Sequence, residues 1–245
     1  MSKKIIYLKD GNYNWKQFEY ESIEDLKSEF ESSNISIGNG ASIGNDASIG
    51  YGASIGNGAS IGDDASIGNR ASIGYGASIG YGASIGDGAS IGYRASIGDG
   101  ASIGDGASIG YRASIGDGAS IGYRASIGYG ASIGDGASIG YRASIGDRAS
   151  IGDGASIGYD ASIGYRASIG KEVKLLTGLF INGSKHSVTY SGNGMLSIGC
   201  HTHSIDEWIA NADNIGIEEK YSTQQINEYK AYIQIAKAFH DNLKK

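Results

Sequence analysis

The residues best suited to chemistry lie near the end of this 245-residue chain, in a Cys-His-Thr-His run at 200–203. Alternate residues of an extended strand point to the same face, so His201 and His203 would lie side by side. Either imidazole could act as a general base, with Asp206 or Glu207 as the carboxylate that orients it. Hydrogen-bonded structural histidines are the alternative, because short His-x-His pairs are frequent by chance.

A metal site is a second interpretation of the same run. His201 and His203 could hold a divalent metal together, with His186 supplying a third nitrogen. A column of aspartates spaced 18 residues apart is a further candidate, because stacked carboxylates can be bridged by a cation such as Ca²⁺ or can bond the turn backbone instead. This column comprises Asp99, Asp117, Asp135 and Asp153.

Tyrosines and arginines recur with the same 18-residue spacing and predict a binding surface. Aromatic rings and guanidinium groups along one edge could stack and shield that edge, or could bind a sugar or a protein. Asp147 interrupts the tyrosine track. The set comprises Tyr75, Tyr93, Tyr111, Tyr129 and Tyr165, with Arg94, Arg112, Arg148 and Arg166 beside them.

These residues must be positioned by a repeat that fills residues 35–172. Isoleucine recurs every six residues from Ile37 to Ile169, and alanine from Ala41 to Ala167, over 23 hexads without an insertion. On an extended strand Ala and Ile point inward, and Ser and Gly point outward. The two variable residues that follow are turn formers or surface residues. A short fixed period of this kind predicts a β-solenoid.

The 18-residue tracks predict three hexads per coil, so that each track lies on one corner of a triangular prism. Recent duplication of an 18-residue unit would leave the same trace. With neighbouring strands about 4.7–4.9 Å apart, the hexads make about 7–8 coils and a rod about 35–40 Å long.

The phrase Ile-Gly-x-x-Ala-Ser, as at 97–102, resembles the hexapeptide motif of left-handed parallel β-helix proteins, the hexapeptide-transferase superfamily. The resemblance implies a left-handed coil with three hexads per turn and, in many members, a trimer. Members generally use a histidine within or beside a coil as general base, and loops extruded from the coils to hold a pantetheine chain. The present repeat contains neither histidine nor insertion, so no catalytic residue is carried over. Acyl transfer from acetyl-CoA would have to use the tail, within 173–210.

Residues 1–34 are predicted to form a small N-terminal ββα cap on the first coil. Strands are expected at 4–8 and 15–20, around an Asp-Gly-Asn turn, and a helix at 23–30. This hairpin and the His-Thr-His tail make the whole chain similar to hexapeptide-repeat proteins of bacteria and phages.

Residues 173–245 are predicted to form a C-terminal cap of strands and a terminal helix. Strands are expected at 173–180 and 185–190, and residues 195–200 are interpreted as one more degenerate rung. Ser222 begins the terminal helix, with a glutamine three residues later that completes a capping box. The apolar stripe of this helix would pack on the end of the solenoid or form a trimer seam.

The net charge, the cysteine count and the apolar runs of the chain limit its possible partners and its possible location. The formal net charge is −6 and no basic stripe is present, which argues against nucleic-acid binding. The single Cys200 excludes an intrachain disulfide framework. No apolar run approaches the length of a membrane span, and the start does not read as a secretory signal. The expected location is the cytoplasm of a bacterial or phage-infected host cell.

Near-identical units favour a non-enzymatic function, because an active site needs unlike residues at unique positions. The main prediction is a structural or interaction solenoid that presents its Tyr, Asp and Arg ladders to a protein or glycan partner. It would be a homo-oligomer, with a trimer favoured, and would require no cofactor. One alternative is an acyltransferase-like enzyme with an acyl-CoA donor. The other is a protein that binds or sequesters a small molecule or an ion.

Overall fold

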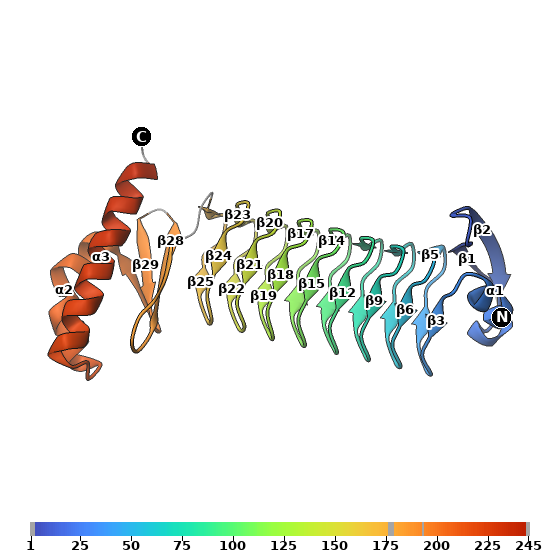
Figure 1. The fold of residues 1–245 in the computed structure, drawn as a ribbon, viewed down its shortest axis with the longest axis horizontal. Helices are drawn as coiled ribbons and strands as arrows, with labels where there is room; N and C mark the ends of the chain where they lie inside the picture. The colour runs from blue at the N-terminus through green and yellow to red at the C-terminus, as the bar shows by residue number, and fades with distance from the viewer. Residues whose placement is uncertain (1–2, 176–178, 193, 244–245) are drawn as a thin grey trace.

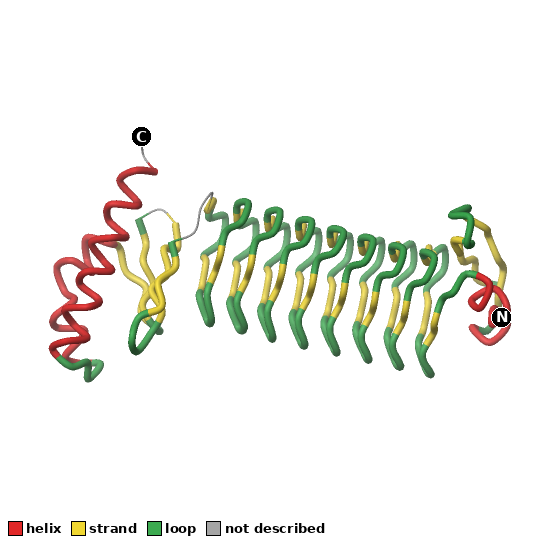
Figure 2. Tube along the Cα trace, viewed as in Figure 1, coloured by secondary structure: helices red, strands yellow, loops and turns green. Residues whose placement is uncertain are grey.

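The computed structural model describes residues 3–175, 179–192 and 194–243. It is a rod of stacked coils with a cap at each end (Figure 1). Short strands alternate with turns along the whole rod, and helices occur in the two caps (Figure 2). The prediction of a β-solenoid with three strands per coil, a small α+β cap and a strand-and-helix cap is confirmed.

Three parallel sheets form the sides of the prism, and each strand pairs with the strand one coil away. Ser96 pairs with Ser114 and Ile97 with Ile115, so the register repeats every 18 residues. The first sheet also includes the N-terminal hairpin. In spatial order it contains β2 (Trp15–Tyr20), β1 (Lys4–Lys9), β5 (Ala47–Ile49), β8 (Ser66–Ile67), β11 (Ser84–Ile85), β14 (Ser102–Ile103), β17 (Ser120–Ile121), β20 (Ser138–Ile139), β23 (Ser156–Ile157) and β26 (Lys174–Leu175).

The other two sheets have eight strands each. The second contains β4 (Ser42–Ile43), β7 (Ser60–Ile61), β10 (Ser78–Ile79), β13 (Ser96–Ile97), β16 (Ser114–Ile115), β19 (Ser132–Ile133), β22 (Ser150–Ile151) and β25 (Ser168–Ile169). The third contains β3 (Ser36–Ile37), β6 (Ser54–Ile55), β9 (Ser72–Ile73), β12 (Ser90–Ile91), β15 (Ser108–Ile109), β18 (Ser126–Ile127), β21 (Ser144–Ile145) and β24 (Ser162–Ile163).

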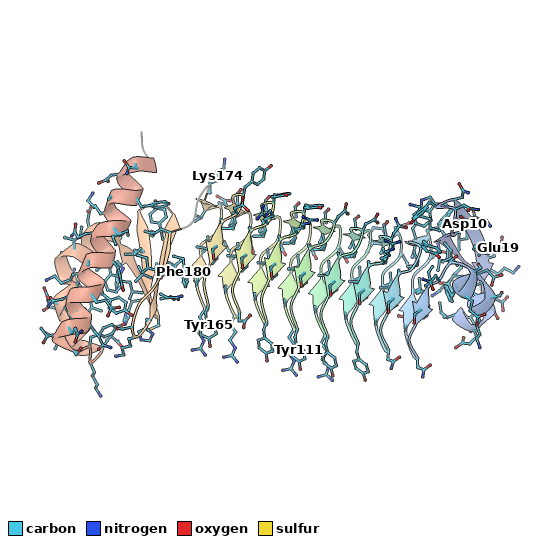
Figure 3. The ribbon with its side chains drawn as sticks, viewed as in Figure 1. Asp10, Glu19, Tyr111, Tyr165, Lys174 and Phe180 are labelled. Atoms are coloured by element: carbon cyan, nitrogen blue, oxygen red, sulfur yellow. The ribbon has the colours of Figure 1, made fainter. Side chains whose placement is uncertain are left out.

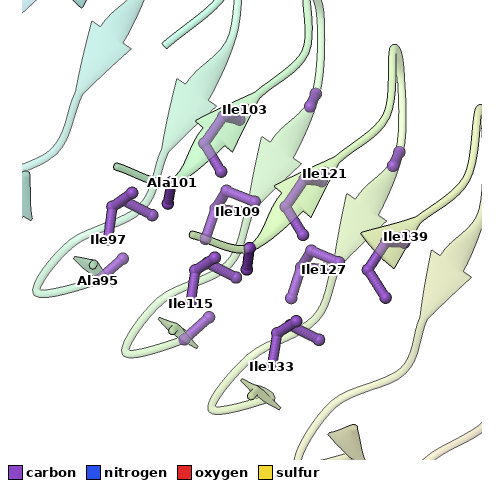
Figure 4. Packing of buried hydrophobic residues seen from close by; sticks show 14 of the residues in the cluster. Ala95, Ile97, Ala101, Ile103, Ile109, Ile115, Ile121, Ile127, Ile133 and Ile139 are labelled. Carbon is purple, nitrogen blue, oxygen red and sulfur yellow. The ribbon is translucent and has the colours of Figure 1, made fainter. Parts of the chain in front are cut away.

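The core is a column of isoleucine and alanine side chains from all three sheets. Ile97, Ile103 and Ile109 of one coil point into the same interior (Figure 4) and are each 2% exposed. The serines between them stand on the outer surface. Burial of one isoleucine contributes about 1.5–3 kcal/mol, so the repeated column supplies the main gross stabilisation of the rod.

Two backbone constraints explain the glycine content of each hexad. The second turn residue has a positive φ, whether it is Gly100 (φ +63°), Arg112 (φ +55°) or Asp64 (φ +57°). The glycine that ends each strand lies against the next coil. A Cβ at Gly98 would come within 2.6 Å of the Asp117 backbone nitrogen and would also clash with the Asp117 carboxylate.

The N-terminal cap extends one sheet and covers part of the first coil. Strand β1 pairs antiparallel with β2 and parallel with β5. The Tyr20 hydroxyl donates a hydrogen bond to the Ile43 carbonyl (2.8 Å), so β2 also reaches the first strand of the second sheet. The expected helix begins as a 3-10 turn (η1, Ile23–Leu26) and continues as α1 (Lys27–Ser32).

The C-terminal cap is a four-stranded antiparallel sheet covered by two helices. Its strands are β27 (Phe180–Asn182), β28 (Ser187–Gly192), β29 (Met195–Ile198) and β30 (His201–Ser204). Figure 1 shows this sheet between the last coil and the helices α2 (Ile205–Glu218) and α3 (Thr223–Leu243).

Two expectations about this cap are corrected. Residues 195–200 are not a further rung. They form β29 and a tight turn at Gly199, whose φ of +60° reverses the chain and makes the pairing antiparallel. The apolar stripe of α3, including Tyr229 and Ile233, is buried as expected, but it packs against α2 and the antiparallel sheet.

The contact at Gly98 yields a stability prediction. We expect Gly98→Ala to lower the free energy of unfolding by about 1–3 kcal/mol, because the added methyl group forces adjacent coils apart. The matched control is Gly100→Asn, two residues away: its Cβ would meet nothing within 4 Å, and asparagine tolerates a positive φ. Denaturant unfolding monitored by circular dichroism measures both. Equal stability of the two variants would contradict this account of the repeat.

Candidate functional site

His201 and His203 lie on strand β30 and share one face of the antiparallel sheet. Their rings are parallel to within 14°, with centroids 6.0 Å apart. The ring of His203 packs edge-on against Trp208 of α2, at 5.1 Å. The predicted adjacency of the two histidines therefore exists, but their surroundings differ.

His201 has a carboxylate partner that lies outside the predicted set. Its Nε2 is 2.9 Å from Oε1 of Glu219, the residue that ends α2. Both side chains are partly exposed, at 36% and 43%. The hydrogen bond from His201 holds the pKa of Glu219 below its ordinary value. A histidine that donates Nε2–H to a carboxylate keeps Nδ1 free to accept a proton.

Asp206 and Glu207 occupy the first turn of α2, where neither is paired with a histidine ring among the described residues. Glu207 closes a capping box: its Oε2 accepts from the backbone nitrogen of Ser204 (2.8 Å), and Ser204 Oγ accepts from the Glu207 nitrogen (3.2 Å). The hydrogen bonds that the backbone N–H and the hydroxyl of Ser204 donate to Glu207 Oε2 lower the pKa of this carboxyl. Glu207 therefore fixes the start of the helix, and Glu219 takes the place expected for an orienting carboxylate.

An apolar pocket of about 30 Å³ lies beside His201. Ile198 of β29, Trp208 and Ile215 of α2, and Ile226 of α3 line it. Tyr221 lines the same pocket, and burial raises the pKa of its hydroxyl to about 12, so this hydroxyl stays protonated near neutral pH.

A larger open cleft of about 680 Å³ separates the last coil from the antiparallel sheet. Arg166 and Tyr165 line it on the solenoid side, and Lys185, His186 and Cys200 on the sheet side. Cys200 lines this cleft, and the next residue in the chain, His201, lines the apolar pocket.

The proposed metal-ligand sets do not assemble in the part of the chain that the structure describes. There, no three His, Cys, Asp or Glu side chains come together in a way that could hold a metal ion. His186 instead contacts the ring of Tyr221, at 5.9 Å, and its backbone nitrogen and carbonyl bond the Tyr229 hydroxyl.

The aspartate column serves the solenoid backbone. Oδ1 of Asp117 accepts from the backbone nitrogen of Asp99, one coil earlier (2.9 Å), and the bond repeats from Asp117 to Asp135 (3.0 Å) and from Asp135 to Asp153 (3.3 Å). Asp153 also pairs with Lys171 (2.7 Å), which lowers the pKa of its carboxyl. The expected bond to turn backbone exists, but it crosses from coil to coil.

The tyrosine track forms a stacked ladder on another corner of the prism. Rings of Tyr75, Tyr93, Tyr111 and Tyr129 follow one another at 5.1–5.2 Å, nearly parallel. The guanidinium groups of Arg94, Arg112 and Arg166 each lie over the ring of the preceding tyrosine, with Cζ 5.0–5.1 Å from the ring centroid. Arg148 donates to the Tyr165 hydroxyl (3.4 Å) across the gap at Asp147.

The residues that sequence reasoning missed are Glu219 and Tyr221. Both are brought to His201 by the length of α2 and the turn that follows it. The available signal was a Ser-x-x-Glu capping box at Ser204, which marks a helix start and assigns Glu207 to the cap.

Comparison with known proteins gives one family match. The hexapeptide repeat of succinyl-transferase matches residues 82–110 and 112–141. No curated protein sequence matches this chain.

Several solved structures are similar at low identity. A variant of GDP-perosamine N-acetyl transferase from Caulobacter crescentus, in complex with CoA and GDP-perosamine, is 22% identical with a TM-score of 0.34, over 48% of this chain and 52% of that one. LpxA from Acinetobacter baumannii is 17% identical with a TM-score of 0.44, over 64% and 69%. The acetyltransferase domain of PglB from Neisseria gonorrhoeae, in complex with acetyl coenzyme A, is 17% identical with a TM-score of 0.28, over 56% and 54%. This chain thus spans about half the length of the first of these proteins.

The family match corrects the main functional prediction. A non-enzymatic structural or interaction solenoid is wrong as the first choice, because the matched repeat is that of a transferase. The near-identity of the coils misled the interpretation, since it describes the scaffold alone and the unlike residues lie in the tail.

The described helices include none that is long and apolar enough to cross a membrane.

The ionised Glu219 yields a pH prediction. Its folded-state pKa lies below the ordinary 4.5, so its contribution to stability is complete above that value and is lost as the pH falls through the lowered pKa. Glu228, whose pKa is lowered by hydrogen bonds from Ser184, behaves in the same way. We expect the helical circular-dichroism signal of α2 and α3 to melt at a lower temperature as the pH falls below about 4.5.

Glu219→Gln combined with Glu228→Gln should flatten this dependence. The neighbouring Glu218→Gln, on the exposed surface of α2, is the control and should keep the native slope. If the double variant loses as much stability on acidification as the native chain, the two carboxylates do not stabilise the cap.

Proposed function

We propose that this chain is an acyl-CoA-dependent acyltransferase, because residues 82–110 and 112–141 match the hexapeptide repeat of succinyl-transferase. The observation that carries the proposal is the His201–Glu219 pair at 2.9 Å beside an apolar pocket. A histidine oriented by a carboxylate is an arrangement that can act as the general base in acyl transfer.

In the proposed reaction, His201 Nδ1 takes the proton of an acceptor amine or hydroxyl as that atom attacks the thioester carbonyl. The carbon–sulfur bond then breaks, and the imidazolium returns the proton to the departing CoA sulfur. Glu219 orients the ring and stabilises its protonated form. The neutral Tyr221 hydroxyl lines the same pocket and is our candidate donor to the thioester oxygen.

The dimensions of the two cavities favour a short acyl group. A pocket of about 30 Å³ holds little more than a methyl group or a water molecule, so we favour acetyl over a long chain. The adjacent cleft of about 680 Å³ is lined by Arg166, Lys185 and His186 and would take the anionic phosphates of the CoA portion. Cys200 of the cleft is followed in the chain by His201 of the pocket.

The proposal includes a homotrimer in the cytoplasm, where an acyl-CoA donor would be met. Of the earlier site assignments, His201 is retained as the base. His203 receives a structural role through its contact with Trp208, and Glu207 through the capping box, while Asp206 is one of the acidic residues in the first turn of α2.

The activity test measures thiol release from acetyl-CoA, with UDP-N-acetylglucosamine and nucleotide-linked amino sugars as acceptors. We expect His201→Gln to lower the rate by roughly 10²–10⁴-fold, as loss of a general base does. Glu219→Gln should lower the rate and alter its pH profile, because the ring loses its orienting charge. Tyr221→Phe should lower the rate with little change in stability, because it removes only the hydroxyl.

His203→Gln is the matched control, since it alters the other histidine of the same strand and should retain most of the activity. Loss of activity in His203→Gln but not in His201→Gln would reassign the base. If the native chain neither turns over nor binds acetyl-CoA, as measured by calorimetry, the proposed function is wrong.

A further inference from the structure

The three corners of the prism carry different net charges. The basic corner, formed by the turn pairs from 57–58 to 165–166 at 18-residue spacing, holds Arg94, Arg112, Arg148 and Arg166 against Asp147, for a net +3. The acidic corner, from 45–46 to 171–172, has a net −7, with Lys171 as its one cation. The neutral corner, from 51–52 to 159–160, holds three arginines and three aspartates.

The neutral corner has no net charge, and one of its three arginines, Arg142, pairs with Asp160 at 3.3 Å. The basic corner differs: no carboxylate of the described residues lies within ion-pair distance of its arginines. Within the same described part, Asp99 and Asp117 of the acidic corner have no cationic partner either. Each uses Oδ1 to accept a backbone N–H of the previous coil. Both corners therefore present uncompensated charge to their surroundings.

The basic corner is also pre-organised. Ring stacking at 5.1–5.2 Å holds the tyrosines in a ladder, and each of Arg94 and Arg112 rests over its ring at 5.0 Å. Tyr111 and Tyr165 project from one edge of the rod (Figure 3). Fixed side chains lose less conformational entropy when a partner binds.

The two charged corners have the same spacing, because one winding chain makes both. Arg94 and Asp99 belong to one coil, and Arg112 and Asp117 to the next. Successive rungs on either corner are 18 residues apart. A second copy lying parallel to the first, at the same height, would therefore bring arginine rungs and aspartate rungs to the same levels.

We propose that the basic corner binds the acidic corner of a second copy of this chain, with the two rods parallel and in register. The two corners flank the same side of the prism, the sheet that runs from β4 to β25, whose outer surface is a flat ladder of serines. Every copy then offers one corner of each sign, so repeated heterologous contacts close a symmetric ring around that side. The neutral corner faces outward. This inference does not depend on the proposed acyl transfer.

The test reverses charges with residues that the repeat already accepts at these positions. Aspartate occupies the second turn position at Asp46, Asp64 and Asp160, and Lys171 occupies the first. One variant carries Arg94→Asp and Arg112→Asp, a second carries Asp99→Lys and Asp117→Lys, and a third combines all four. Light scattering after size-exclusion chromatography gives the mass of each in low salt, where exposed charges are least screened.

We expect the native chain to form an oligomer whose dissociation constant rises with salt. Each charge reversal alone should weaken association at least about tenfold, because like charges then face each other. The four-residue variant should recover the native mass, because it restores complementary corners. Arg70→Asp with Arg124→Asp, on the neutral corner, should leave the mass unchanged.

Orientation is tested by carbodiimide coupling of the Arg112→Lys variant. Mass spectrometry should find the introduced amine joined to Asp117 of another copy. Three results would overturn the proposal: a monomeric native chain at low salt, an oligomer indifferent to both reversals, or a folded four-residue variant that stays monomeric. Binding of a polyanion such as heparin to a monomeric native chain would likewise show that another partner uses the basic corner.

Discussion

The close approach of successive coils at one glycine per hexad governs the rest of this molecule. At Gly98 the next coil is so near that even a methyl group would collide with the backbone nitrogen of Asp117. This contact lets Gly98 N–H reach the Ile115 carbonyl at 2.8 Å, and it keeps every isoleucine directly above its counterpart. The outer surface of each repeat strand carries a serine, such as the exposed Ser96. Residue types vary only at the corners of the prism and in the two caps. An active site needs unlike residues at unique positions, so we expect it in the C-terminal tail.

At the corners of the prism, residue types can vary although the rest of the repeat is constrained. A turn pair may be Tyr-Arg, Asp-Gly or Asn-Arg without disturbing the coil, because the first residue points outward and the second needs only a positive φ. The choices are not scattered, since four of the seven repeat arginines lie on the basic corner and seven of the eleven repeat aspartates lie on the acidic corner. The aspartates stabilise their own stack by accepting backbone N–H groups across coils, as Asp117 does from Asp99. The arginines lie over tyrosine rings and make no equivalent backbone bond among the described residues.

Much of the rod was predictable because its rules are local. Alternation of Ala and Ile, the 18-residue tracks and the turn residues fix which side chains are buried and how many hexads close a coil. The tail was not predictable in the same way. Residues 195–200 resemble another hexad in sequence, yet the positive φ of Gly199 turns them into an antiparallel hairpin. The partner of His201 was missed because Glu219 lies 18 residues away and reaches the ring only through the packing of α2.

The candidate acid–base pair depends on where α2 begins and ends. Ser204 and Glu207 fix its first turn, and Lys185 Nζ bonds the Glu219 carbonyl (2.7 Å) at its last. The helix thus starts at the end of the strand that bears His201, and the turn after it brings Glu219 back to the same ring. Since a helix rises about 1.5 Å per residue, one residue more or less would displace the carboxylate by about that distance and rotate it by about 100° around the axis. Glu207, which looked like a catalytic partner in the sequence, acts on His201 only by setting this position.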